Sequence, residues 1–162
     1  MTITADSLKA LAQRELASCS DMTVVEGLQS IIVEPTVHLR TWEYASDGAA
    51  YPCWSIASSL SHSTAIVYSE YGHGPQNPWG LVSPSDLSYG MDSAWFPNLI
   101  EAYLDSSMAA ALPIWSAWRQ DDSGNRYELA RSLTYDKALA LTTDFETRGH
   151  KQTFWVSRTV AR

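Results

Sequence analysis

Apolar residues recur with a helical period in three parts of the chain. Residues three and four positions apart share one face of a helix, so this period predicts a helix with one buried side. The first stripe consists of Leu8, Leu11, Ala12 and Leu16. Asn98 and Thr134 precede the other two stripes, and each offers a side-chain oxygen that can cap a helix. The expected helices cover residues 6–18, 98–111 and 135–147.

Between these helices apolar and polar positions alternate, which is typical of strands with one buried face. Turns rich in Asp, Ser, Gly and Asn, over 46–48 and 121–125, are expected to join neighbouring strands as hairpins. The expected strands cover residues 30–34, 37–44, 51–58, 64–69, 79–82, 114–120, 126–133 and 153–160. The 162 residues therefore predict a single α+β domain over 1–162, with a mainly antiparallel sheet and about three helices.

The stretch from 68 to 97 is rich in Gly, Pro, Trp and Tyr and poor in basic residues. Turn formers argue against a plain helix here, whereas the aromatic rings give large apolar area with a polar end. We predict an ordered binding surface, which requires rings that are partly exposed; core packing is the alternative for any single Trp. A second acidic feature is expected at Asp121 and Asp122, on a hairpin tip. The residues of the central stretch expected to bind a partner are Glu70, Tyr71, Trp79, Asp86, Tyr89, Asp92 and Trp95.

The formal net charge of −7 gives the surface a negative sign. This sign opposes binding to nucleic acid or to an anionic membrane, and it attracts a basic protein. Cys19 and Cys53 lack a paired-cysteine spacing, so we expect reduced thiols. The N-terminus has neither the basic nor the apolar region of a signal peptide, and no apolar run is long enough for a membrane span. These features predict a cytoplasmic protein with no membrane segment.

No motif for nucleotide, zinc or hydrolase chemistry is present, and the four histidines fall in different segments. We therefore expect no metal and no cofactor. His73 is flanked by glycines and can serve as an acid or base with Asp92 or Glu70, as in a small hydrolase-type enzyme. The alternative is a loop histidine that bonds a backbone carbonyl. Cys53 has no local partner that would activate its thiol, so we expect a small buried apolar residue.

The segments Gly72–Pro75, Pro78–Val82 and Gly90–Phe96 lie in the central stretch. In these residues the chain resembles immunity proteins of bacterial polymorphic or contact-dependent toxin systems. The resemblance implies a cytoplasmic inhibitor that binds one cognate, basic toxin domain and has no catalytic residues. Stoichiometric protein binding is therefore favoured over catalysis. The alternatives are a small enzyme that uses His73 and a small-ligand binding module with an aromatic pocket.

Overall fold

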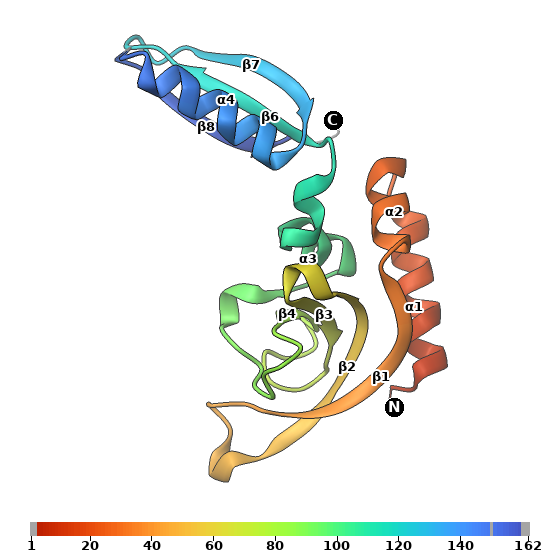
Figure 1. Cartoon of the computed structure of the whole chain (residues 1–162). Helices are drawn as coiled ribbons and strands as arrows, with labels where there is room; N and C mark the ends of the chain where they lie inside the picture. The colour runs from red at the N-terminus through yellow and green to blue at the C-terminus, as the bar shows by residue number, and fades with distance from the viewer. Residues whose placement is uncertain (1–2, 150, 160–162) are drawn as a thin grey trace. The chain divides into compact units, whose positions relative to one another are not determined.

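The computed structural model describes residues 3–149 and 151–159, and their contacts divide the chain into two compact units, Met1–Ala109 and Ala110–Arg162. Each unit has its own antiparallel sheet with helices beside it (Figure 1). The α+β class predicted from the sequence is confirmed. The expectation of a single domain over 1–162 stays a prediction.

The sheet of the first unit is a meander in which every strand pairs with the next one along the chain. The strands are β1 (Ile32–Thr41), β2 (Ala50–Ser59), β3 (Thr64–Tyr68), β4 (Trp79–Val82) and β5 (Trp95–Phe96). The end of β1 is also joined to the loop before β5. The amide of Thr41 donates to the carbonyl of Leu87 at 2.7 Å, and the amide of Tyr89 donates to the carbonyl of Thr41 at 2.9 Å. These bonds close the curled sheet at one end.

The inner side of this curl holds a core cluster that combines small side chains of the strands with large aromatic rings. Because side chains alternate along a strand, neighbouring positions of β1 and β2 face either this core or the outside. Arg40 faces inward opposite Tyr51, whereas Leu39 faces outward opposite Pro52. The cluster consists of Cys53, Ala65, Val67, Val82, Tyr89 and Trp95, with Trp42 and Tyr51 packed against it.

In its described residues the first unit has three α-helices: α1 (Ala5–Ser18), α2 (Met22–Gln29) and α3 (Leu99–Asp105). Thr4 caps α1, and the buried side of α1 is formed by Leu8, Ala12 and Leu16. The carboxylate of Glu15 joins three elements, because it accepts hydrogen bonds from the indole N–H of Trp79 and from the amide of Leu99 at the start of α3.

Three expectations for the first unit are corrected by the structure. Helix α2 was not expected, since its β-branched residues favour a strand. Its start is stabilised by the Asp21 carboxylate, which accepts hydrogen bonds from the amides of Thr23 and Val24. The segments 30–34 and 37–44 form the single strand β1, because Pro35 is tolerated on an edge strand, beside a shift in register. The helix expected over 98–111 ends at Asp105 and continues as a separate 3₁₀ helix, Ser107–Ala111.

Over residues 110–149 and 151–159 the second unit consists of a three-stranded sheet and one α-helix. Its strands, β6 (Trp115–Gln120), β7 (Arg126–Leu133) and β8 (Thr153–Arg158), lie in the order β7-β6-β8. Helix α4 (Tyr135–Thr147), capped by Thr134 as predicted, packs on one face through the stacked rings of Phe145 and Phe154. Since Trp155 follows Phe154 in β8, it points to the other face, where it stacks with Trp118. Val160, expected to face inward, lies outside the described residues.

Candidate binding surface

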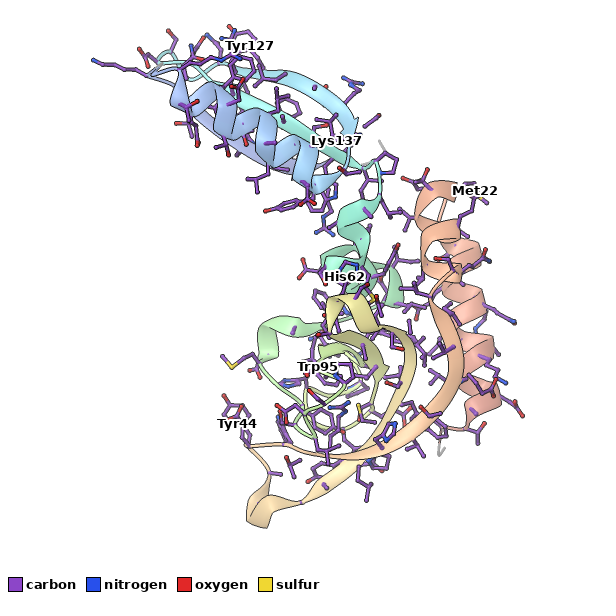
Figure 2. All side chains as sticks on the ribbon, viewed as in Figure 1. Met22, Tyr44, His62, Trp95, Tyr127 and Lys137 are labelled. Carbon is purple, nitrogen blue, oxygen red and sulfur yellow. The ribbon has the colours of Figure 1, made fainter. Side chains whose placement is uncertain are left out.

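Three of the four rings expected to form an exposed surface lie in the core of the first unit. Trp79 is 0% exposed, Tyr89 1% and Trp95 6%. Trp95 stacks on Tyr89 and donates from its indole N–H to the Tyr89 carbonyl at 3.0 Å. A Cβ atom at Gly80 would lie 2.7 Å from the Trp95 ring, so the backbone of β4 is packed directly against this ring. These three rings are therefore not partly exposed, as a binding surface in the free chain would require. Trp95 is labelled in Figure 2.

Tyr71 is the ring of the predicted set that remains accessible, with 49% of its surface exposed. It stacks on Tyr51, with ring centroids 5.1 Å apart. Beside it lies a depression of about 410 Å³, which we call the outer groove. The outer groove is lined by Ile3, Val37, Pro52, Trp54, Ser69, Glu70 and Tyr71.

The outer groove follows from the strand pairing of β1 and β2. Val37 lies opposite Trp54, and Leu39 lies opposite Pro52, so apolar side chains of both strands share the outward face. Val37 and Leu39 are both exposed. The sequence reveals the alternation of β1, but only the register with β2 brings Trp54 beside Val37.

The predicted carboxylates of the central stretch are all exposed, and two of them also hold loops in place. Asp86 accepts hydrogen bonds from the amide and the hydroxyl of Ser88, at 3.1 and 3.0 Å. The Oδ1 of Asp92 lies 3.0 Å from the imidazole Nδ1 of His73. Glu70 lines the outer groove next to Tyr71. Of the three, Glu70 is therefore the carboxylate placed with an accessible ring.

His73 and Asp92 are brought together, as the enzyme alternative requires, but the imidazole is enclosed. The His73 side chain is 9% exposed, and its ring lies 5.1 Å from that of Trp95 and 5.8 Å from that of Trp42. Its Nε2 is buried and has no hydrogen-bond partner among the described residues. This enclosure favours a packing role, in which His73 joins its loop to the 3₁₀ helix Asp92–Ala94.

Arg40 is a buried cation that the sequence analysis did not single out. Its Nη1 donates to the carbonyls of Ser83, Asp86 and Ser88, so a charge that would be costly to bury alone is bonded to one loop. Arg40 also lies beside Cys53, whose thiol is buried as expected; this burial raises the pKa of the thiol to about 12. Cys53 is therefore a protonated thiol at neutral pH.

The acidic hairpin tip of the second unit is less free than expected. Asp121 accepts from the amides of Ser123 and Asn125 and from the Tyr127 hydroxyl. The hydrogen bonds from Asn125, from its side chain above all, lower the pKa of the Asp121 carboxyl. The carboxylate of Asp121 therefore shapes the turn, and Asp122 is the exposed acid of the pair.

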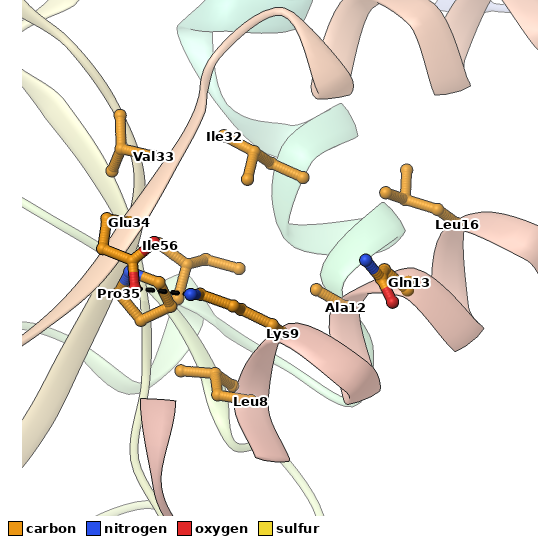
Figure 3. A pocket seen from close by; sticks show the side chains of 10 residues that line it. All are labelled: Leu8, Lys9, Ala12, Gln13, Leu16, Ile32, Val33, Glu34, Pro35 and Ile56. Atoms are coloured by element: carbon orange, nitrogen blue, oxygen red, sulfur yellow. Dashed lines mark ion pairs between the residues drawn. The ribbon is translucent and has the colours of Figure 1, made fainter. Parts of the chain in front are cut away.

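A further hollow lies between α1 and β1, with a volume of about 280 Å³ (Figure 3). Its wall is mostly aliphatic, and an ion pair between Lys9 and Glu34, 2.5 Å long, crosses it from the helix to the strand. The lining residues are Leu8, Lys9, Ala12, Gln13, Leu16, Ile32, Val33, Glu34, Pro35 and Ile56. No aromatic side chain contributes to it, so it differs from the aromatic pocket of the small-ligand alternative.

The net negative charge of the chain comes from the first unit, because the second unit has a small net positive charge. Residues 1–109 contain twelve Asp and Glu against three Lys and Arg, a formal charge of −9. Residues 110–162 contain six Asp and Glu against eight Lys and Arg, a formal charge of +2. In the first unit, moreover, Arg40 is buried and Lys9 is paired with Glu34. The net charge of the whole chain concealed this contrast, although the sequence contains it.

A comparison with protein-family models finds no match, and comparisons with curated proteins and with solved structures find none either. The resemblance to immunity proteins therefore stays a prediction. Within the described residues, no group of three or more His, Cys, Asp and Glu side chains is arranged to hold a metal ion. In the same part of the chain, no helix is long and apolar enough to cross a membrane.

Proposed function

We propose that this chain is a stoichiometric inhibitor that binds a basic protein, most concretely a bacterial toxin domain, through the outer groove. The observation that carries the proposal is the accessible apolar surface of Tyr71, Val37 and Leu39 on a unit with a formal charge of −9. Half-exposed aromatic rings at the centre of an interface contribute much of its binding energy. A strongly acidic unit accelerates association with a basic partner and disfavours acidic competitors.

In the proposed interface, Tyr71 contributes close contact and Glu70 contributes long-range attraction. Tyr71 is held by its stack on Tyr51, so its ring loses little conformational freedom on binding. Glu70 is exposed at the same groove and contributes to the attraction before contact. Trp79, which was expected to contact the partner, is enclosed in the core, and its removal would damage the fold rather than the interface.

The test is co-expression and co-purification with the protein encoded by the gene immediately upstream. We expect a one-to-one complex in which the activity of the upstream protein is blocked. Tyr71→Ala should accelerate dissociation, with a loss of about 2 kcal/mol if the ring is a hot spot. Glu70→Gln should mainly slow association, and this effect should fade at high salt.

Glu26→Gln is the matched control, because Glu26 is an exposed carboxylate on α2 outside the outer groove. It removes the same charge from the same unit as Glu70→Gln. Equal association rates for these two variants would show that total charge matters and the groove does not. Binding that is unchanged by Tyr71→Ala, or inhibition that is not stoichiometric, would refute the proposal.

A further inference from the structure

A second surface lies at the closed end of the curled sheet, where loops of the first unit converge. Backbone hydrogen bonds join Thr41 to Leu87 and to Tyr89. Arg40 binds the carbonyls of the same loop, including that of Asp86. A contact of 3.0 Å between His73 Nδ1 and Asp92 Oδ1 joins the loop of His73 to the segment that follows Gly90. Three stretches that are far apart in the sequence are thereby fixed against one another.

This end of the sheet, which we call the loop end, combines exposed apolar side chains with exposed carboxylates. The apolar members are Tyr44, Leu87 and Met91, and the acidic members are Glu43, Asp86 and Asp92. The Tyr44 ring contacts the edge of the Trp42 ring, and Trp42 in turn contacts His73. Figure 2 labels Tyr44 near the end of β1. The loop end thus offers apolar contacts within a negatively charged rim.

A cavity of about 270 Å³ opens at the loop end. It is lined by Thr41, Trp42, Glu43, Ala45, Gly48, Ser88, Tyr89 and Gly90. This volume is below the range of about 300–1,000 Å³ that drug-sized ligands occupy, so a single side chain is the better fit. Glu43 enters no ion pair between the described residues. The lining therefore includes one residue with an indole ring, Trp42, and one with a carboxylate, Glu43.

We infer that this cavity receives an arginine side chain of the basic partner, an inference that rests on the proposed function. A guanidinium group stacks on an aromatic ring and donates paired hydrogen bonds to a carboxylate, as Trp42 and Glu43 would require. The formal charge of −9 on this unit supports a cationic occupant over a neutral or anionic one. Tyr44, Leu87 and Met91 then contact the partner surface around the inserted arginine.

The first experiment uses a defined compound, N-acetyl-L-arginine methylamide, with ¹⁵N-labelled full-length protein. We expect saturable NMR shifts centred on the Trp42 indole N–H and the amides of Gly48 and Gly90. Glu43→Gln should weaken this binding about tenfold, because it removes a charge-assisted contact. Glu26→Gln, which removes an exposed carboxylate from α2, should leave the affinity unchanged.

N-acetyl-L-citrulline methylamide provides the matched neutral ligand, since it keeps the shape of arginine without the charge. Equal shifts from the citrulline compound would overturn the inference, as would unchanged affinity in Glu43→Gln. Shifts that stay linear with concentration would also overturn it, because they indicate no specific site. A spectrum of Glu43→Gln that is unaltered away from the loop end shows that the variant is folded.

A second experiment, with the inhibited partner, separates this inference from the proposed function. A partner whose affinity falls with Tyr71→Ala but not with Glu43→Gln would refute the arginine site and leave the inhibitor proposal standing. Saturable binding of the arginine compound without any inhibitory complex would refute the inhibitor proposal and the assignment of the site to a partner. A fall in affinity with both variants supports both conclusions.

Discussion

Glu15 is expected to stabilise the first unit more than Asp6, the other carboxylate of α1, because the Glu15 side chain accepts hydrogen bonds from two donors. Its Oε1 accepts from the Trp79 indole N–H at 3.0 Å, and its Oε2 accepts from the amide of Leu99 at 2.5 Å. Trp79 and Leu99 are both 0% exposed. Glu15→Ala would therefore leave one buried indole donor and one helix N-terminal amide without an acceptor.

The size of the effect follows from these two donors. A buried donor that loses its only acceptor costs about 1–3 kcal/mol, and loss of the hydrogen bond to the Leu99 amide adds about 0.5–1.5 kcal/mol. We expect Glu15→Ala to destabilise the first unit by about 2–4 kcal/mol, a large part of the 5–15 kcal/mol typical of a domain. Glu15→Gln keeps one oxygen acceptor, so about half of that loss is expected.

Hydrogen exchange of the Trp79 indole, measured by NMR, reports the effect locally, and urea unfolding reports it for the unit. In Glu15→Ala, the indole should exchange faster by a factor that matches the loss of stability. Glu26→Ala, in the neighbouring helix α2, is the control for removal of an exposed helical carboxylate. Equal urea midpoints for the Glu15 and Glu26 variants, with unchanged Trp79 exchange, would refute the reasoning.

Three further predictions concern single residues. Burial raises the pKa of the Cys53 thiol to about 12, so a thiol reagent at pH 8 should label only Cys19 in the native protein. Both thiols should be labelled in urea. Labelling of two thiols in the native protein would contradict this prediction. Folding lowers the pKa of Asp121, chiefly through the hydrogen bond from the Asn125 side chain. The ionised carboxylate therefore stabilises the folded state above its unfolded pKa, and this stabilisation is lost as the pH falls below about 4 and through the folded pKa. Asp121→Asn should reduce this acid-range loss of stability in a pH series of thermal melts, whereas an unchanged series would exclude the contribution. Gly80→Ala places a Cβ 2.7 Å from the Trp95 ring and should destabilise the first unit by about 1–3 kcal/mol; a urea midpoint equal to that of the native chain would contradict it.

Elements whose signals are local could be predicted from the sequence. Helices α1 and α4 have an apolar period and a capping threonine at the start, and both form with nearly the predicted bounds. The turn at 121–125 forms through bonds between Asp121 and Asn125, two residues within the turn itself. Such contacts depend on neighbours in the sequence, so a single sequence is sufficient to reveal them.

Elements that depend on distant contacts could not be predicted in this way. Helix α2 contains β-branched residues that favour strands, yet its Val24, Val25 and Leu28 are buried in the first unit, and packing outweighs a propensity of a few tenths of a kcal/mol. The outer groove requires the register between β1 and β2, and the cavity at the loop end requires residues 87–89 to pair with Thr41. Neither pairing has a signal in the local pattern.

The central stretch shows why abundant aromatic residues do not by themselves indicate an exposed surface. The sheet of the first unit is packed on both faces: Tyr89 and Trp95 fill the core cluster on one face, and Trp79 lies on the other, where its indole N–H binds Glu15 of α1. Once these rings are buried, an interface must use what the strands and loop tips leave outside. That remainder is Tyr71 and the aliphatic residues beside it, and at the loop end Tyr44 and its neighbours. The rings of the central stretch therefore fix the loops from within, and in the proposed interface the contact falls to residues whose exposure follows from strand register and loop pairing.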